Sequence, residues 1–195
     1  MQTNDQFDKR ELDVLLRELK KVLGGQVSGG IVELGCYRGL TSIEIAKLLK
    51  NKKSPKQLYL YDSFAGLPPK AKEDNSPAGL QFKAGELPAN KQEVINLFKK
   101  SGLTVPIVKK AWFHDLTLSD LPDEIALAFL DGDFYESIMD SLRLVWPKLA
   151  TGSVVIVDDY QNEALPGAQK AVNEWLKIHT AKIVVEASLA IIRKL

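Results

Sequence analysis

Two pairs of aspartates follow apolar segments in the C-terminal half of the sequence. In the stretch AFLDGDFYES, residues 128–137, the apolar run leads into Asp131 and Asp133. In GSVVIVDDYQ, which begins at residue 152, it leads into Asp158 and Asp159. Carboxylates at the ends of neighbouring strands, ~4.8 Å apart, would repel one another without a cation. Such hard oxygen ligands suit Mg²⁺ or Ca²⁺, and the lack of Cys and His beside them argues against zinc. Two plainer interpretations stay open: Asp133 caps the next helix, and the other pair is solvated.

A glycine-containing turn supplies a second chemical signal. In ELGCYRGLTS, Glu33, Gly35 and Gly39 have a spacing that differs from the G-x-G-x-x-G dinucleotide pattern. The glycines allow a backbone to pass close to a ligand, and the following helix start offers free N–H groups. Asp62 ends the next apolar segment, where a carboxylate can accept hydrogen bonds from a ribose diol. These residues predict a nucleoside site; the alternative is a tight turn whose glycines serve packing alone.

The elements that would position these residues alternate along the chain. Apolar spacing predicts helices over residues 7–23, 41–51, 91–102, 136–149 and 167–179. Strands are expected over residues 29–35, 57–62, 105–113, 125–131 and 152–159, and two more in 181–195 with a turn at Ala187 and Ser188. Residues 63–90 are expected to form a long surface loop. The pattern predicts an α/β fold with a doubly wound, mostly parallel seven-stranded sheet and an antiparallel C-terminal strand.

Composition limits the other possibilities. The 195 residues suit one domain, 1–195, and the formal net charge of +1 gives no basis for attraction to nucleic acid or membranes. No apolar run reaches the roughly 18–20 residues of a membrane helix, and the N-terminus does not resemble a signal peptide. The single cysteine, Cys36, excludes an intrachain disulfide. We therefore expect a cytoplasmic protein that contacts neither membrane nor nucleic acid.

The stretch VELGCYRGLTS resembles motif I of class I S-adenosylmethionine-dependent methyltransferases. In that family the turn holds the amino acid end of the cofactor, and an acid after the second strand binds the ribose. The resemblance implies that S-adenosylmethionine is the cofactor and that Ser63 and Phe64 lie by the adenosine, with Asp115 near the adenine. The implied cofactor contacts are Glu33, Gly35, Tyr37, Gly39, Thr41, Asp62, Ser63, Phe64, Asp115 and Asp131.

A narrower resemblance covers about residues 30–180. The segments FLDGDFYESIMDSL, GSVVIVDDY and GAQKAVNEW closely resemble the macrocin O-methyltransferase (TylF-type) group, as do YDSFAGLP and AWFHDLTLSDLP. Members methylate sugar hydroxyls of natural products and use a divalent metal, usually Mg²⁺. The resemblance implies that Asp131, Asp158 and Asp159 bind the metal and that Asp133 is the general base. Members carry a longer region where this chain has residues 1–29, a short helical segment, so a partner subunit in a homodimer is one way to complete the acceptor pocket.

These observations predict a Mg²⁺-dependent O-methyltransferase acting on a small hydroxylated molecule, with a sugar or a glycosylated natural product favoured. A catechol-type metal-dependent methyltransferase would use carboxylates at the same strand ends. A non-catalytic nucleoside-binding domain of the same fold is the alternative from another class of protein. A nicotinamide dehydrogenase is disfavoured by the glycine spacing.

Overall fold

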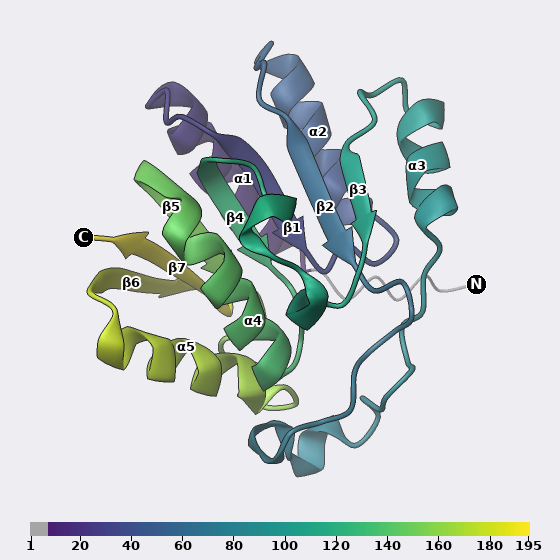
Figure 1. The fold of residues 1–195 in the computed structure, drawn as a ribbon, viewed down its shortest axis with the longest axis vertical. Helices are drawn as coiled ribbons and strands as arrows, with labels where there is room; N and C mark the ends of the chain where they lie inside the picture. Colours follow the sequence, from purple (N-terminus) through teal and green to yellow (C-terminus); the bar gives the residue numbers. More distant parts are fainter. Residues whose placement is uncertain (1–7) are drawn as a thin grey trace.

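The computed structural model describes residues 8–195, which form one seven-stranded sheet with helices on both faces (Figure 1). The strands lie in the order β3-β2-β1-β4-β5-β7-β6; β7 runs antiparallel to β5 and β6, and the other neighbouring pairs are parallel. The strands are β1 (Gly30–Leu34), β2 (Leu58–Asp62), β3 (Ile107–Lys110), β4 (Ile125–Leu130), β5 (Leu149–Val157), β6 (Ala181–Glu186) and β7 (Leu189–Lys194). The predicted doubly wound fold is confirmed.

Five α-helices cover the sheet. They are α1 (Lys9–Gly24), α2 (Leu40–Asn51), α3 (Lys91–Lys100), α4 (Tyr135–Val145) and α5 (Pro166–Ile178). Helices α1, α2 and α3 cover one face of the sheet, and α4 and α5 cover the other (Figure 1). Apolar side chains of the first three form one core layer with the sheet, and those of α4 and α5 form the other. No helix in residues 8–195 is long and apolar enough to cross a bilayer.

Alternation along each strand divides its side chains between the two core layers. In β1, Ile31 packs on the side of α1 and α2, whereas Val32 and Leu34 pack on the side of α4 and α5. All five residues of β1 and all six of β4 are buried. Continuous apolar sequences are expected for parallel strands whose two faces are both covered, which is why these segments could be predicted.

Several expected boundaries move in the structure. The third strand is shorter than expected and is followed by a short 3-10 helix, Phe113–Asp115, because the chain turns over the sheet edge after Lys110. The loop of residues 63–90 contains two 3-10 turns, Lys72–Asp74 and Pro77–Gly79. Phe7, the expected start of the first helix, lies outside the described residues.

This loop is fastened to the body of the protein by a buried carboxylate, that of Asp74. One oxygen of Asp74 accepts a hydrogen bond from the backbone N–H of Ala71 at 2.9 Å, and the other from that of Tyr135 at 2.7 Å. Asp74 therefore caps α4, and the proposal that Asp133 does so is wrong, since no side chain of the α4 start provides the cap. A Cβ atom on Gly167 would lie 1.7 Å from Asp74 Oδ1, so only glycine leaves room for this contact.

We expect Asp74→Asn to lower the free energy of unfolding by about 1–2 kcal/mol, the usual effect of losing a helix cap. The amide has an NH₂ donor in place of one of the two accepting oxygens, so one backbone N–H is left unsatisfied in a buried place. Urea denaturation measures the change. Glu73→Gln is the matched control, because the Glu73 side chain makes one ion pair within residues 8–195, with Lys72 Nζ at 3.6 Å. Equal stability of the two variants would contradict the capping role.

Candidate active site

The candidate site lies where strand order reverses, between β1 and β4. Backbone hydrogen bonds continue past the strand ends, from Gly35 N to Tyr61 O, Asp131 N to Leu34 O and Asp158 N to Leu130 O. The segments after four parallel strands are thus held in register at one edge of the sheet. They form the wall of a cavity of about 440 Å³, into which the predicted carboxylates converge.

Three of these carboxylates form a compact cluster. Asp131, Asp133 and Asp159 each place an oxygen within 4.8 Å of the others, and each side chain is only partly exposed. The metal ligands expected from the family resemblance include Asp158 and not Asp133. The cluster in the structure therefore differs from the expected set by one residue. The backbone φ of +59° at Asp133 turns its side chain back toward the end of β4. Asp133 therefore lies within the cluster rather than along the helix that follows.

Asp158 lies beside this cluster and has an unsatisfied oxygen. Its side chain is buried and lines the cavity, and its Oδ1 atom has no hydrogen-bond partner among the described residues. Asp159, in contrast, accepts a hydrogen bond from Asn162 Nδ2 at 2.7 Å. A buried carboxylate oxygen without a donor is costly unless a cation or a proton satisfies it. The donor set, all oxygen, fits a hard divalent cation such as Mg²⁺.

Burial and mutual repulsion disfavour the ionised forms of the cluster. Burial, together with the charge of Asp159, raises the pKa of Asp133 to about 8. Burial raises the pKa of Asp159 to about 6. Burial, then the charges of Asp158 and Asp133, raise the pKa of Asp131 well above its ordinary value. Groups of acids whose pKa values are raised by burial and by one another are common in functional sites.

The glycine turn forms the adjoining wall of the cavity. Asp62 accepts hydrogen bonds from the backbone N–H of Tyr37 at 2.8 Å and of Phe64 at 2.6 Å, one on each carboxylate oxygen. Gly35 has φ +97°, and a Cβ atom there would lie 1.7 Å from the carbonyl oxygen of Asp131. The turn therefore packs directly against the carboxylate segment. Asp62 also lines the cavity, and each of its carboxylate oxygens has a further lone pair with which it could accept a hydrogen bond from a ribose hydroxyl.

Glu33 lies beneath this turn. It is 1% exposed, accepts a hydrogen bond from the hydroxyl of Ser42, and still lines the cavity. Burial raises its pKa to about 8, and the hydrogen bond from Ser42 opposes that shift. Glu33 is thus a buried acid with one side-chain donor, and one of its oxygens remains available to a cationic group of a ligand.

Most of the predicted cofactor contacts line the cavity, and three do not. The lining residues are Glu33, Gly35, Tyr37, Thr41, Asp62, Ser63 and Asp131. Phe64 is instead buried in the core layer of α1, α2 and α3, because its φ of +52° turns the side chain inward. Asp115 is exposed and lies 3.6 Å from His114. Gly39 is the N-cap of α2, with φ +80°, so it shapes the turn without lining the cavity.

Other cavity residues carried little or no signal in the sequence. Trp112, Phe113 and His114 follow β3 and line the cavity, although single aromatic residues at a strand end more often belong to a core. Glu11 of α1 accepts a hydrogen bond from the hydroxyl of Ser188 in the β6–β7 turn, and both residues line the cavity. They are 177 positions apart, so no local pattern could have paired them.

Left-handed backbone conformations also mark the cavity wall. Tyr37, Asp133 and Asp159 have φ values of +46°, +59° and +57°, and all three line the cavity. Non-glycine residues rarely adopt this conformation, and such strain is frequent where side chains must be aimed at a ligand. It is consistent with a site built to hold a ligand rather than a solvated sheet edge.

The family model of the macrocin O-methyltransferases (TylF) matches residues 6–188. The chain belongs to this family. Demethyldecarbamoylnovobiocin O-methyltransferase of Streptomyces niveus is 31% identical over 173 residues, and 8-demethyl-8-(2,3-dimethoxy-alpha-L-rhamnosyl)-tetracenomycin-C 4'-O-methyltransferase of Streptomyces olivaceus is 32% identical over 173 residues. Each alignment covers 85% of this chain and 65% of the relative, so the chain spans less than two thirds of the length of either protein.

A solved structure supports the fold of the chain. The structure of the O-methyltransferase NovP matches with a TM-score of 0.79 and 26% identity, covering 94% of this chain and 78% of that one. The family membership and the class I methyltransferase fold predicted from the sequence are therefore confirmed.

Proposed function

We propose that this protein is a Mg²⁺-dependent, S-adenosylmethionine-dependent O-methyltransferase whose acceptor is a sugar hydroxyl of a small glycosylated molecule. The observation that carries the proposal is the meeting of two features in one cavity. The turn after β1, with Asp62, lies against the carboxylate cluster, and Gly35 makes the contact between them. Both relatives are named O-methyltransferases, and the name of the Streptomyces olivaceus protein describes a rhamnosyl-bearing substrate, which supports the same chemistry here.

Residues of both walls would hold the two bound groups. When bound, S-adenosylmethionine supplies an electrophilic methyl group on a sulfonium, and Mg²⁺ supplies Lewis acidity that makes a hydroxyl easier to deprotonate. Asp62 would accept hydrogen bonds from the ribose hydroxyls. Glu33 lies beneath the turn that resembles motif I. We assign Asp131, Asp158 and Asp159 to the metal, because Asp158 Oδ1 is the oxygen that lacks a partner.

Asp133 is then left to move the proton. One of its carboxylate oxygens lies within 4.8 Å of an oxygen of Asp131 and of Asp159. Its pKa of about 8 suits a base that works near neutral pH. Its carboxylate would take the proton of the acceptor hydroxyl. The walls of the cavity would hold the acceptor oxygen in line with the methyl group, which lowers the entropic part of the barrier.

The charge of the cavity bears on the acceptor. Besides the cluster, Asp8, Glu11, Glu136, Asp140 and Glu163 line the cavity, whereas Arg38 and His114 are the only basic residues among the described lining residues. A nucleoside diphosphate sugar would bring two phosphates into this negative field without a clamp of arginines or lysines. We therefore expect a neutral or cationic glycoside rather than a sugar nucleotide.

Calorimetric titration followed by an acceptor screen tests the proposal. S-adenosylhomocysteine should bind and NAD should not. With S-adenosylmethionine and Mg²⁺ present, methyl transfer should occur to neutral glycosides and not to the matching nucleoside diphosphate sugars. Transfer to catechols alone would establish the catechol-type alternative. Binding of S-adenosylhomocysteine without transfer to any acceptor class would favour a non-catalytic domain.

Divalent cation affinity should rise with pH. Ligand carboxylates must lose their protons to bind a cation. The pKa of Asp159 is raised to about 6, and those of the other two assigned ligands, Asp131 and Asp158, lie well above the ordinary value, so cation binding at low pH must displace protons. We expect the dissociation constant for Mg²⁺ to fall by about tenfold per pH unit for each proton displaced, as the pH rises through the pKa values of these ligands. Titration calorimetry at several pH values measures this, and a pH-independent constant would contradict it.

A further inference from the structure

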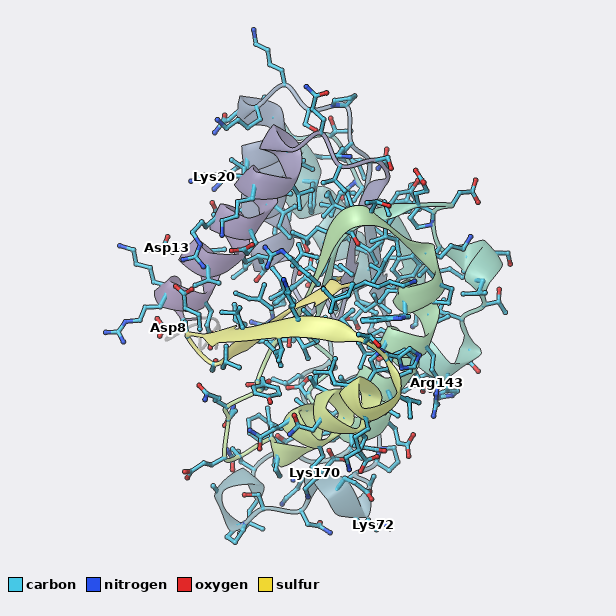
Figure 2. The ribbon with its side chains drawn as sticks, turned by 90° about the vertical axis from the view of Figure 1, so that its left-hand side faces the viewer. Asp8, Asp13, Lys20, Lys72, Arg143 and Lys170 are labelled. Carbon is cyan, nitrogen blue, oxygen red and sulfur yellow. The ribbon has the colours of Figure 1, made fainter. Side chains whose placement is uncertain are left out.

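The outer edge of β6 is open. β6 ends the sheet and pairs only with β7, through an unbroken register from Ala181 to Glu186. In Figure 2, β6 crosses the foreground between α1 above and α5 below, and no other ribbon of the described residues lies in front of it. Every residue from Lys182 to Glu186 is exposed, including Ile183, Val184 and Val185 at 36%, 54% and 37%.

This edge lacks the usual features that prevent strands from pairing. Natural edge strands are commonly protected by proline, by a bulge, or by a charge near the middle of the strand. β6 contains no proline, its register with β7 has no bulge, and its middle is three consecutive β-branched apolar residues. Its two charges, Lys182 and Glu186, lie toward the ends. Such a strand is suited to receive another strand rather than to face water.

The sequence of β6 is complementary to itself in one antiparallel register. Lys182 and Glu186 are each two residues from Val184, on opposite sides. If two copies pair about Val184, each Lys182 lies opposite Glu186 of the other copy, and each Ile183 lies opposite Val185. A shift of two residues would place charges opposite apolar side chains, so the pattern specifies this register.

We propose that two copies of this chain form a two-fold symmetric dimer by antiparallel pairing of their β6 strands about Val184. The result is one continuous sheet across both copies. A two-fold axis requires the same surface on both partners, and β6 meets this condition. The dimer does not depend on which acceptor the enzyme uses.

The charges on the same face of β6 favour the dimer. Within the chain, Lys182 lies opposite Arg193 of β7, a like charge, and makes no ion pair or hydrogen bond with any described residue. Arg193 is itself paired with Glu18. Glu186 accepts hydrogen bonds from Arg17 at 2.8 and 2.7 Å, one on each oxygen, and each oxygen keeps a further lone pair. Pairing would give Lys182 the acid that it lacks in the single copy.

The same pairing would act on the cavity wall. Glu186 is followed by the turn that contains Ser188, which lines the cavity and donates to Glu11. A strand added beside β6 would hold the start of this turn in place. A partner subunit beside the cavity was one expectation from the family resemblance, and β6 is the edge through which it would act.

Sedimentation analysis of the full chain, with three charge variants, tests the proposal. The wild-type protein should be a dimer, and Val184→Lys should be monomeric because it places like charges on the two-fold axis. Lys182→Glu should weaken the dimer by about tenfold, since it sets two pairs of acids opposite each other. Lys182→Glu combined with Glu186→Lys should restore it. A monomeric wild type, or a double variant no better than the single one, would overturn the proposal.

Disulfide trapping tests the register separately. In this register the two Val184 side chains are directly opposite, with Cβ atoms ~5 Å apart, so Val184→Cys should form a linked dimer on mild oxidation. The control is Lys182→Cys, whose two copies would be displaced by four residues, ~13 Å along the strands, and should not link. The native Cys36 is buried and will not interfere. A dimer that links through the control, or through neither variant, uses another surface and rejects this one.

Discussion

Asp131→Asn is expected to reduce Mg²⁺-stimulated methyl transfer by about 100-fold or more, while S-adenosylhomocysteine still binds. Asp131 directly follows β4 and is a member both of the predicted metal set and of the cluster of Asp131, Asp133 and Asp159. An amide is a weaker ligand for a hard cation, and it removes one negative charge from the site. Because the pKa of Asp131 is already raised, the variant should fold at least as stably as the wild type.

Substitutions at two further aspartates distinguish a role in metal binding from a role in proton transfer. If Asp158 is a ligand and Asp133 the base, Asp158→Asn should weaken Mg²⁺ binding, while Asp133→Asn should bind Mg²⁺ and lose turnover. Glu136→Gln is the matched control, because Glu136 lines the cavity outside the cluster. Full activity of Asp131→Asn would reject the metal site. Loss of Mg²⁺ binding in Asp133→Asn alone would instead assign Asp133 to the metal.

Gly35→Ala is expected to destabilise the fold by about 3 kcal/mol or more, and to abolish cofactor binding in any protein that still folds. A Cβ atom at this position would lie 1.7 Å from the carbonyl oxygen of Asp131, and that oxygen belongs to the backbone, which cannot move aside easily. The change would therefore push apart the glycine turn and the carboxylate segment, the two walls of the cavity.

Gly85→Ala provides the matched control, because Gly85 has a similar positive φ of +81° and open space around it. It should cost only about 1–2 kcal/mol, the conformational penalty of alanine in the left-handed region. The difference between the two variants in urea denaturation therefore measures the contact with Asp131. Equal stabilities would show that the two walls do not need this close approach.

The fold, and the edge of the sheet where the site lies, could be predicted from residue patterns alone. Apolar runs such as that of β4 are long enough for a strand and too uniform for a surface, so they indicate a covered parallel sheet. Parallel strands all end at the same edge, so Asp62, Asp131 and Asp158 had to converge there. These conclusions depend on backbone periodicity, which neighbouring residues encode.

The detailed assembly of the site follows from the packing of the folded chain. The left-handed backbone at Asp133 brings that residue into the cluster, and the same conformation turns Phe64 into the core. Asp74 caps α4 by accepting a hydrogen bond from Tyr135, 61 residues away. Ser188 donates a hydrogen bond to Glu11 in the wall of the cavity. These contacts depend on the packing of distant segments and on single backbone angles. Neither leaves a periodic signal in the sequence, because each is set by a few long-range contacts rather than by the repeat of a helix or a strand.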